Sequence, residues 1–149
     1  MTSSISSDRA IANLIARYSF LVDDGDFEGL GELLASCTFT LGTGPAVTGS
    51  ETIARLARGA LMTYDDGTPH TRHVTTNILI EVDETAGTAR SQSYYTVFQS
   101  LPDFPLQPIA SGTYYDRFER RNGTWLFAER SVQTRFAGDT RHHRRQAPP

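Results

Sequence analysis

The first third of the chain shows hydrophobic positions at the spacing of a helix. Apolar side chains recur every three or four residues from Ile11 to Val22, after a helix-capping signal at residues 6–8. This pattern predicts a first helix over residues 7–22. Gly25 follows as its terminator, since glycine readily takes the backbone conformation that ends a helix.

Two more helices and a short strand are predicted before the middle of the chain. Helical spacing of apolar residues indicates a short helix over residues 27–34 and a third helix over residues 51–64. Between them, residues 37–41 alternate in polarity and are predicted to form a strand, which Val47 accompanies as part of a second short strand.

The second half of the chain is rich in β-branched and aromatic residues. Four such segments, separated by turn signals, predict four strands at residues 74–82, 89–99, 109–120 and 125–136. Residues 83–87 and 102–108 are expected to be turns, and Asn122-Gly123 is a strong hairpin signal. The segments therefore predict a four-stranded antiparallel meander.

This order predicts an α+β fold with three N-terminal helices packed on a curved, mostly antiparallel sheet. Residues 1–149 are expected to form one domain, with a flexible tail over about residues 137–149. The Arg/His run of this tail is interpreted as a solvated end rather than as a binding arm.

The amino-acid composition excludes several classes of partner and of catalytic mechanism. A formal charge of −3 gives no reason to expect a nucleic-acid or membrane partner. All 14 basic residues counted as Lys or Arg are Arg, which excludes a Schiff-base or lysine-base mechanism. The single Cys37 cannot form an intrachain disulfide. Without a metal motif, phosphate loop, signal peptide or membrane span, we expect a soluble, cytoplasmic protein that uses no cofactor or metal.

Four groups of residues carry a resemblance to a known family. They are Arg17-Tyr18 with Val22-Asp23-x-x-Asp26-Phe27, Gly49-x-x-x-Ile53, His73-x-x-x-Asn77, and Gly112-x-Tyr114-x-Asp116-x-Phe118 with Asn122-Gly123-x-Trp125 and Arg130. In this order they resemble the NTF2-like superfamily, specifically its SnoaL-like domains. The resemblance spans roughly residues 8–135 and implies a cone-shaped fold.

Within that superfamily, the likeness is nearest to the scytalone dehydratase and hexachlorocyclohexane dehydrochlorinase branch. It implies a histidine at the start of a strand, at His73, and in the dehydrochlorinase an aspartate partner at Asp23. In scytalone dehydratase the aspartate falls instead on Phe20, so scytalone is not the expected substrate. The ketosteroid isomerase branch fits less well, because residues 38–41 lack its carboxylate.

Asp23 and His73 are the candidate catalytic residues. A neutral imidazole can take a proton near pH 7, and a carboxylate on its other nitrogen fixes its tautomer and stabilises the imidazolium. The alternatives are a strand histidine bonded to backbone and a solvated carboxylate at a helix end. Asp23 lies at the edge of the first helix's apolar stripe, which fits either interpretation.

Five further residues are candidates for binding a substrate: Tyr18, Asn77, Tyr114, Asp116 and Arg130. Tyr18 lies on the apolar stripe and can donate to a developing oxyanion or bond to backbone. Asn77 follows His73 by four residues, so it is expected on the same strand face as a polar pocket residue. Asp116 is either a second acid or base, or the ion-pair partner of Arg130.

These residues predict a cofactor-independent lyase or isomerase of the dehydratase or cyclase type. Its substrate is expected to be small and mostly apolar, with polycyclic and aromatic compounds among the candidates. The alternative is a non-catalytic small-molecule-binding or assembly module of the same fold. In either case a homodimer or homotrimer is expected through the outer face of the sheet, for which the candidates are Tyr95, Val97, Tyr115 and Val132.

Overall fold

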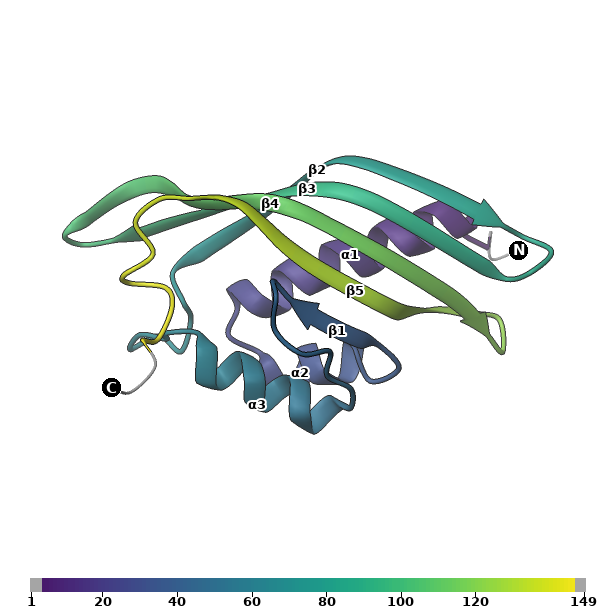
Figure 1. The fold of residues 1–149 in the computed structure, drawn as a ribbon, viewed down its shortest axis with the longest axis horizontal. Helices are drawn as coiled ribbons and strands as arrows, with labels where there is room; N and C mark the ends of the chain where they lie inside the picture. The colour runs from purple at the N-terminus through teal and green to yellow at the C-terminus, as the bar shows by residue number, and fades with distance from the viewer. Residues whose placement is uncertain (1–3, 147–149) are drawn as a thin grey trace.

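A computed structural model describes residues 4–146 of the chain. The helices are α1 (Ser7–Asp23), α2 (Phe27–Leu33) and α3 (Ser50–Ala60), and the strands are β1 (Thr38–Leu41), β2 (Thr71–Asp83), β3 (Thr88–Leu101), β4 (Phe104–Arg121) and β5 (Thr124–Ala137). Figure 1 shows the long strands arching over α1, with α2 and α3 farther from the sheet.

The five strands form one mixed sheet in the order β1-β5-β4-β3-β2. β1 runs parallel to β5, and the four long strands pair antiparallel with their neighbours in sequence. Three helices packed on a curved, mostly antiparallel sheet are the arrangement that the sequence predicts, so the predicted fold class is confirmed.

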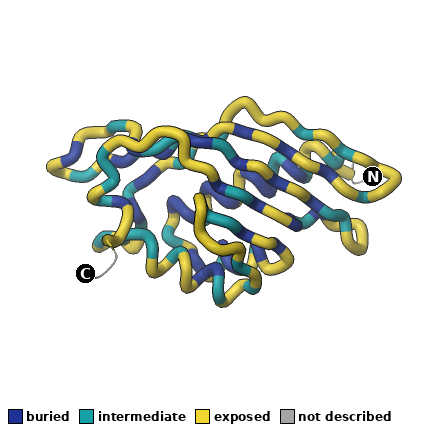
Figure 2. Tube along the Cα trace, in the orientation of Figure 1, coloured by how far each residue is buried: buried dark blue, intermediate teal, exposed yellow. Residues whose placement is uncertain are grey.

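The core lies between the inner face of this sheet and the helices. Ile11 and Ile15 of α1 are fully buried against it, as are Phe118 of β4 and Phe127 of β5. Buried and exposed residues alternate along the long strands, as Figure 2 shows. Burying each such side chain stabilises the fold by about 1.5–3 kcal/mol.

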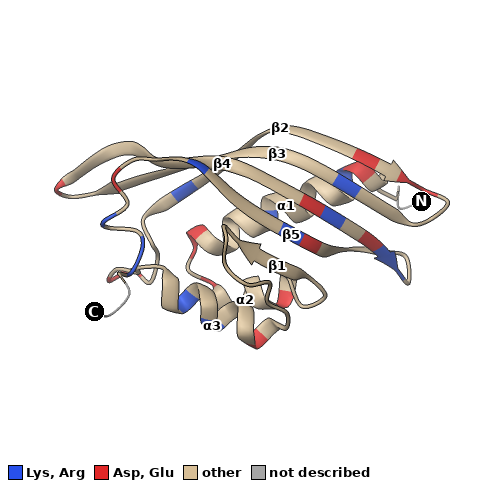
Figure 3. Cartoon of the chain, viewed as in Figure 1, with Lys and Arg blue, Asp and Glu red and all other residues tan. Residues whose placement is uncertain are grey.

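The hairpin signal at Asn122-Gly123 is confirmed. Asn122 has φ 51° and Gly123 has φ 77°, the positive values of the tight turn that joins β4 to β5. Figure 3 shows charged residues gathered on the strands toward this end of the sheet. There the exposed pairs Arg90–Glu81 and Arg117–Glu129 lie on its outer side.

Most element boundaries lie within three residues of the prediction, and two differ by more. α3 ends at Ala60 rather than residue 64, because Leu61 is extended and its backbone pairs with that of Arg144. The region 102–108 is not a long turn, since β4 already begins at Phe104. Its prolines are accommodated where the pairing between β3 and β4 shifts register.

The outer-face candidates were mostly assigned to the wrong side of the sheet. Tyr95, Val97 and Val132 are 4%, 2% and 6% exposed, and they face the core. Only Tyr115, 44% exposed, lies on the outer side. Side chains alternate between the two faces of a strand, so Tyr115 points outward while its neighbour Tyr114 points into the core. Self-association stays a prediction.

The C-terminal segment, residues 138–146, folds back onto the rest of the chain, in contrast with the flexible tail expected from the sequence. Gly138 N–H donates to Ile109 O at 2.8 Å, Met62 N–H to His143 O at 2.9 Å, and Arg145 N–H to Ala60 O at 2.9 Å. The remainder of that predicted tail, residues 147–149, lies outside the described residues. None of the described helices is long and apolar enough to span a bilayer.

Candidate active site

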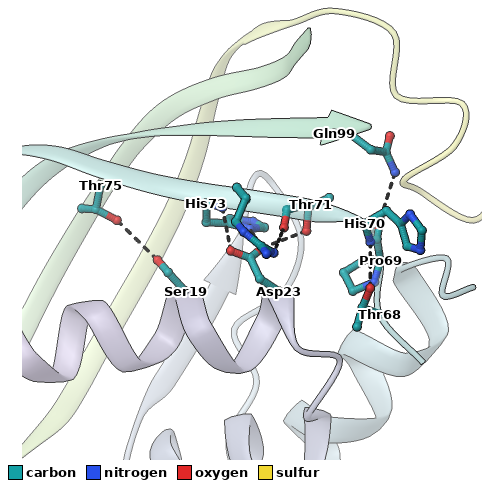
Figure 4. Close-up of polar contacts among 10 residues, drawn as sticks. Ser19, Asp23, Thr68, Pro69, His70, Thr71, His73, Thr75 and Gln99 are labelled. Carbon is teal, nitrogen blue, oxygen red and sulfur yellow. Dashed lines mark hydrogen bonds and ion pairs between the residues drawn. The ribbon is translucent and has the colours of Figure 1, made fainter. Parts of the chain in front are cut away.

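Asp23 and His73 meet where the last residue of α1 reaches the first residues of β2 (Figure 4). Oδ1 of Asp23 lies 2.6 Å from Nδ1 of His73, and Oδ2 accepts the backbone N–H of His73 at 2.8 Å. The hydroxyl of Thr71 donates to Oδ1 at 2.8 Å. The structure therefore brings together the two residues that the sequence proposed as a pair.

The position of Asp23 is electrostatically unfavourable for a charged carboxylate. The C-terminal end of a helix carries partial negative charge, which disfavours a carboxylate there by about 0.3–1 kcal/mol. Asp23 is also only 6% exposed, so its charge is poorly hydrated. The donors from Thr71 and His73 offset both costs and hold the carboxylate in one orientation.

The contact with Asp23 determines how His73 carries its proton. A carboxylate can only accept hydrogen bonds, so Nδ1 of His73 is the protonated nitrogen. In the neutral ring Nε2 is then left with a free lone pair, which is the arrangement of a general base. The His73 side chain is 10% exposed, so this base is largely shielded from solvent.

Asp23 and His73 themselves line a cavity of about 330 Å³ between α1 and β2. A second, mostly apolar cavity of about 110 Å³ lies inside the cone and reaches Val22 and His143, the neighbours of this pair. Its lining comes from α1, α2, α3, the sheet and the C-terminal segment, and includes Tyr18, Val22, Phe39, Ile53, Leu61, Tyr95 and His143. Tyr18 thus takes the inward position expected from its place on the apolar stripe. Burial raises the pKa of its hydroxyl to about 12, so Tyr18 remains protonated near neutral pH.

Arg130 and Asp116 form a buried ion pair in the core. Nε and Nη2 of Arg130 lie 2.8 and 3.2 Å from the two oxygens of Asp116, and both side chains have no exposed surface. Burial raises the pKa of Asp116, while the guanidinium opposes that shift. This geometry is the ion-pair alternative of the sequence interpretation, and it engages both carboxylate oxygens.

Aromatic rings enclose the guanidinium of Arg130. It lies 4.1 Å from the ring centre of Tyr18 and 3.8 Å from that of Tyr114. Tyr114 is 1% exposed and stacks on Tyr95 at 4.5 Å. Tyr114 and Asp116 are therefore absent from the cavity lining, and it is Tyr114 and Arg130 that pack against the ring of Tyr18.

Asn77 does not share a face with His73. The pairing of β2 with β3 is interrupted between Thr76 and Leu79, and Asn77 takes φ 53° in this irregularity. The interruption breaks the alternation that would have turned Asn77 inward, so its side chain is exposed. The structure thus places Asn77 on the surface, away from the pocket in which the sequence predicted it.

Sequence reasoning missed His143. It lies in the segment expected to be a flexible tail, but it is 6% exposed, lines the cavity, and its ring centre is 6.3 Å from that of His73. Nothing in the local pattern marks it, because its position depends on long-range contacts with α3. Among residues 4–146, no group of three or more His, Cys, Asp or Glu side chains is arranged to hold a metal ion.

Comparison with known proteins agrees with this architecture. The family model of the SnoaL-like domain matches residues 3–131. Rv3472(D26N) of Mycobacterium tuberculosis, described as a protein of unknown function, is 25% identical, with a TM-score of 0.70 over 86% of this chain and 71% of that one. A comparison with curated proteins found no match.

Two further structures are similar in fold. One, from Novosphingobium aromaticivorans and provisionally assigned as a scytalone dehydratase, is 24% identical with a TM-score of 0.69, covering 89% of this chain and 86% of that one. LinA is 23% identical with a TM-score of 0.70, covering 96% and 95%. With the family match spanning most of its length, the chain belongs to the SnoaL-like domain family, within the NTF2-like fold.

Proposed function

We propose that this protein is a cofactor-independent lyase or isomerase in which His73 removes a proton from carbon and Asp23 orients the imidazole. The observation that carries the proposal is the 2.6 Å contact between Nδ1 of His73 and Oδ1 of the buried Asp23. The SnoaL-like family includes isomerases, dehydratases and cyclases, which fits such a site.

The proposed step needs only the two side chains. Nε2 of His73 takes the proton, and the electron pair of the C–H bond moves into the substrate, toward a carbonyl oxygen or a leaving group. The resulting imidazolium is stabilised by the carboxylate of Asp23. Dehydration, cyclisation and double-bond isomerisation all begin in this way.

The two cavities limit the size of the substrate in this conformation. A cavity of about 150 Å³ lined by apolar side chains is known to hold benzene; the apolar cavity inside the cone measures about 110 Å³, and the one that Asp23 and His73 line about 330 Å³. We therefore propose single-ring or similarly small hydroxy and keto compounds as the substrate class, in preference to polycyclic ones.

Hydrogen–deuterium exchange tests this proposal without knowledge of the product. Small cyclic ketones and β-hydroxy ketones are incubated with the protein in D₂O, and loss of the C–H signal next to the carbonyl is followed by NMR. We expect exchange of at least one compound above the buffer rate, and its loss in His73→Ala. His70→Asn is the matched control, because His70 pairs with Asp66 on the surface.

The competing function is a non-catalytic binding module of the same fold. It predicts that compounds bind in the cavity but exchange at the buffer rate with wild type and His73→Ala alike. Exchange that is fast in the wild type and unchanged in His73→Ala would also contradict the proposal, since another base would then be responsible.

A further inference from the structure

His143 is a buried histidine with unused hydrogen-bonding capacity. It is 6% exposed, and its Nδ1 is enclosed without a hydrogen-bond partner in the part of the chain that the structure describes. Burying a polar atom without a partner costs free energy, so such atoms call for an explanation. Since Nδ1 itself is closed off from the cavity, Nε2 is the ring nitrogen left to meet a ligand group there.

The backbone of this segment is fixed, so the ring has a defined position. His143 N–H donates to Thr140 O at 3.0 Å, and His143 O accepts from Met62 N–H at 2.9 Å. The preceding carbonyl, that of His142, accepts from the hydroxyl of Tyr64 and from the buried amide of Gln99. Contacts from β3 and from the chain after α3 therefore hold this residue at the cavity.

His143 adjoins both the cavity and the proposed base. It lines the cavity, and its ring centre is 6.3 Å from that of His73, a separation at which the two tilted rings are direct neighbours, so a group held by His143 would lie close to the proposed base. Burial lowers the pKa of His143 to about 4, and the neighbouring His73 and Arg144 add to this, while Asp23 opposes it. The ring is therefore neutral near pH 7, where one of its nitrogens carries a proton to donate.

We propose that His143 is a further residue of the active site, which donates a hydrogen bond to the oxygen of a small hydroxy or keto compound bound in the cavity. This role extends the proposed function and rests on it for the catalytic step, although binding of the oxygen does not require turnover. The C-terminal segment would then be part of the site.

In the proposed step His143 donates a hydrogen bond but transfers no proton. The proton on carbon goes to Nε2 of His73, the C–H electron pair forms a carbon–carbon double bond, and the carbonyl electrons move onto oxygen. His143 keeps its own proton and stabilises the enolate through the hydrogen bond. A neutral imidazole is suited to this role because it donates strongly to an oxyanion without competing for the proton.

The test compares two probes that differ in one hydroxyl, 4-fluorophenol and fluorobenzene, titrated into the full chain at pH 7 and followed by ¹⁹F NMR. In the wild type we expect 4-fluorophenol to bind more tightly. In His143→Phe the preference for 4-fluorophenol over fluorobenzene should fall about ten-fold, the value of one buried hydrogen bond. His143→Gln, which keeps an N–H donor, should retain most of the preference.

His142→Phe is the matched control, since its ring packs against Phe104 and does not line the cavity. It should leave the preference unchanged, and thermal unfolding checks that every variant is folded. An equal preference in the wild type and His143→Phe would overturn the proposal, as would failure of both probes to bind. Loss of preference without any exchange activity would support the role of His143 while the proposed function fails.

Discussion

Nδ1 of His73 lies 2.6 Å from Oδ1 of Asp23, although the two residues are 50 positions apart in the sequence. The contact joins the end of α1 to the start of β2. The two other groups that donate hydrogen bonds to the carboxylate also come from the start of β2. Because the pair combines an oriented imidazole with a buried carboxylate next to an apolar cavity, it is the centre of the proposed chemistry.

Asp23→Asn tests the carboxylate. The amide cannot stabilise an imidazolium and can favour the wrong tautomer of His73, so we expect exchange on a responsive ketone to fall by about 10²–10⁴. The variant should remain folded, with a loss of about 1–3 kcal/mol in the free energy of unfolding from the weakened hydrogen bonds. Urea denaturation and NMR exchange measure the two effects. Exchange at the wild-type rate would remove Asp23 from the mechanism.

Replacing Arg130 tests the buried ion pair. In Arg130→Met the carboxylate of Asp116 stays buried without its partner, so we expect a loss of about 3–5 kcal/mol in the free energy of unfolding. Arg90→Ala provides the comparison, because the exposed pair Arg90–Glu81 should contribute no more than about 1 kcal/mol. Similar, small losses in both variants would show that the Arg130–Asp116 pair does not hold the core.

The pH dependence of stability tests the environment of His143. Its pKa in the folded chain is about 4 against an ordinary value of 6.5, so the unfolded chain binds more protons between these values. Stability is therefore complete above pH 6.5 and falls as the pH drops toward 4. Between pH 7 and pH 5 this group should cost about 2 kcal/mol.

Urea denaturation at the two pH values measures this loss. His143→Gln cannot titrate, so the variant should lose about 2 kcal/mol less than the wild type over the same interval. An identical pH dependence in both proteins would show that His143 titrates normally, as an exposed histidine does.

A substitution at Asn77 is expected to leave activity unchanged, in contrast with the substitution at Asp23. Its φ of 53° is costly for most residues but free for glycine. Asn77→Gly should therefore keep both stability and exchange activity, whereas Asn77→Val should destabilise the fold by about 1–2 kcal/mol. Denaturation and exchange assays on both variants check this. A large loss of activity in Asn77→Gly would restore Asn77 as a site residue.

Much of the fold could be predicted because its signals are local. The stripe from Ile11 to Val22 and the turn at Asn122-Gly123 each depend on neighbours in sequence. The irregularity at Asn77 could not be predicted, since it arises from pairing with β3. The direction of Tyr95 also depends on register, and one residue decides which face a side chain takes.

The site was only partly predictable for the same reason. The pairing of Asp23 with His73 was inferred from a family resemblance, and the buried pair of Asp116 with Arg130 from charge complementarity. His143 had neither signal. Its place at the cavity comes from backbone contacts with the chain beyond α3, which no periodicity near residue 143 indicates.

The most direct test of the central claim is chemical rescue of His73→Ala. Exchange of a responsive ketone is measured in D₂O for the wild type and for the variant, without and with added imidazole. If His73 is the base, the variant should exchange at the buffer rate and recover part of the wild-type rate when imidazole is added. Undiminished exchange by His73→Ala without imidazole would contradict the account.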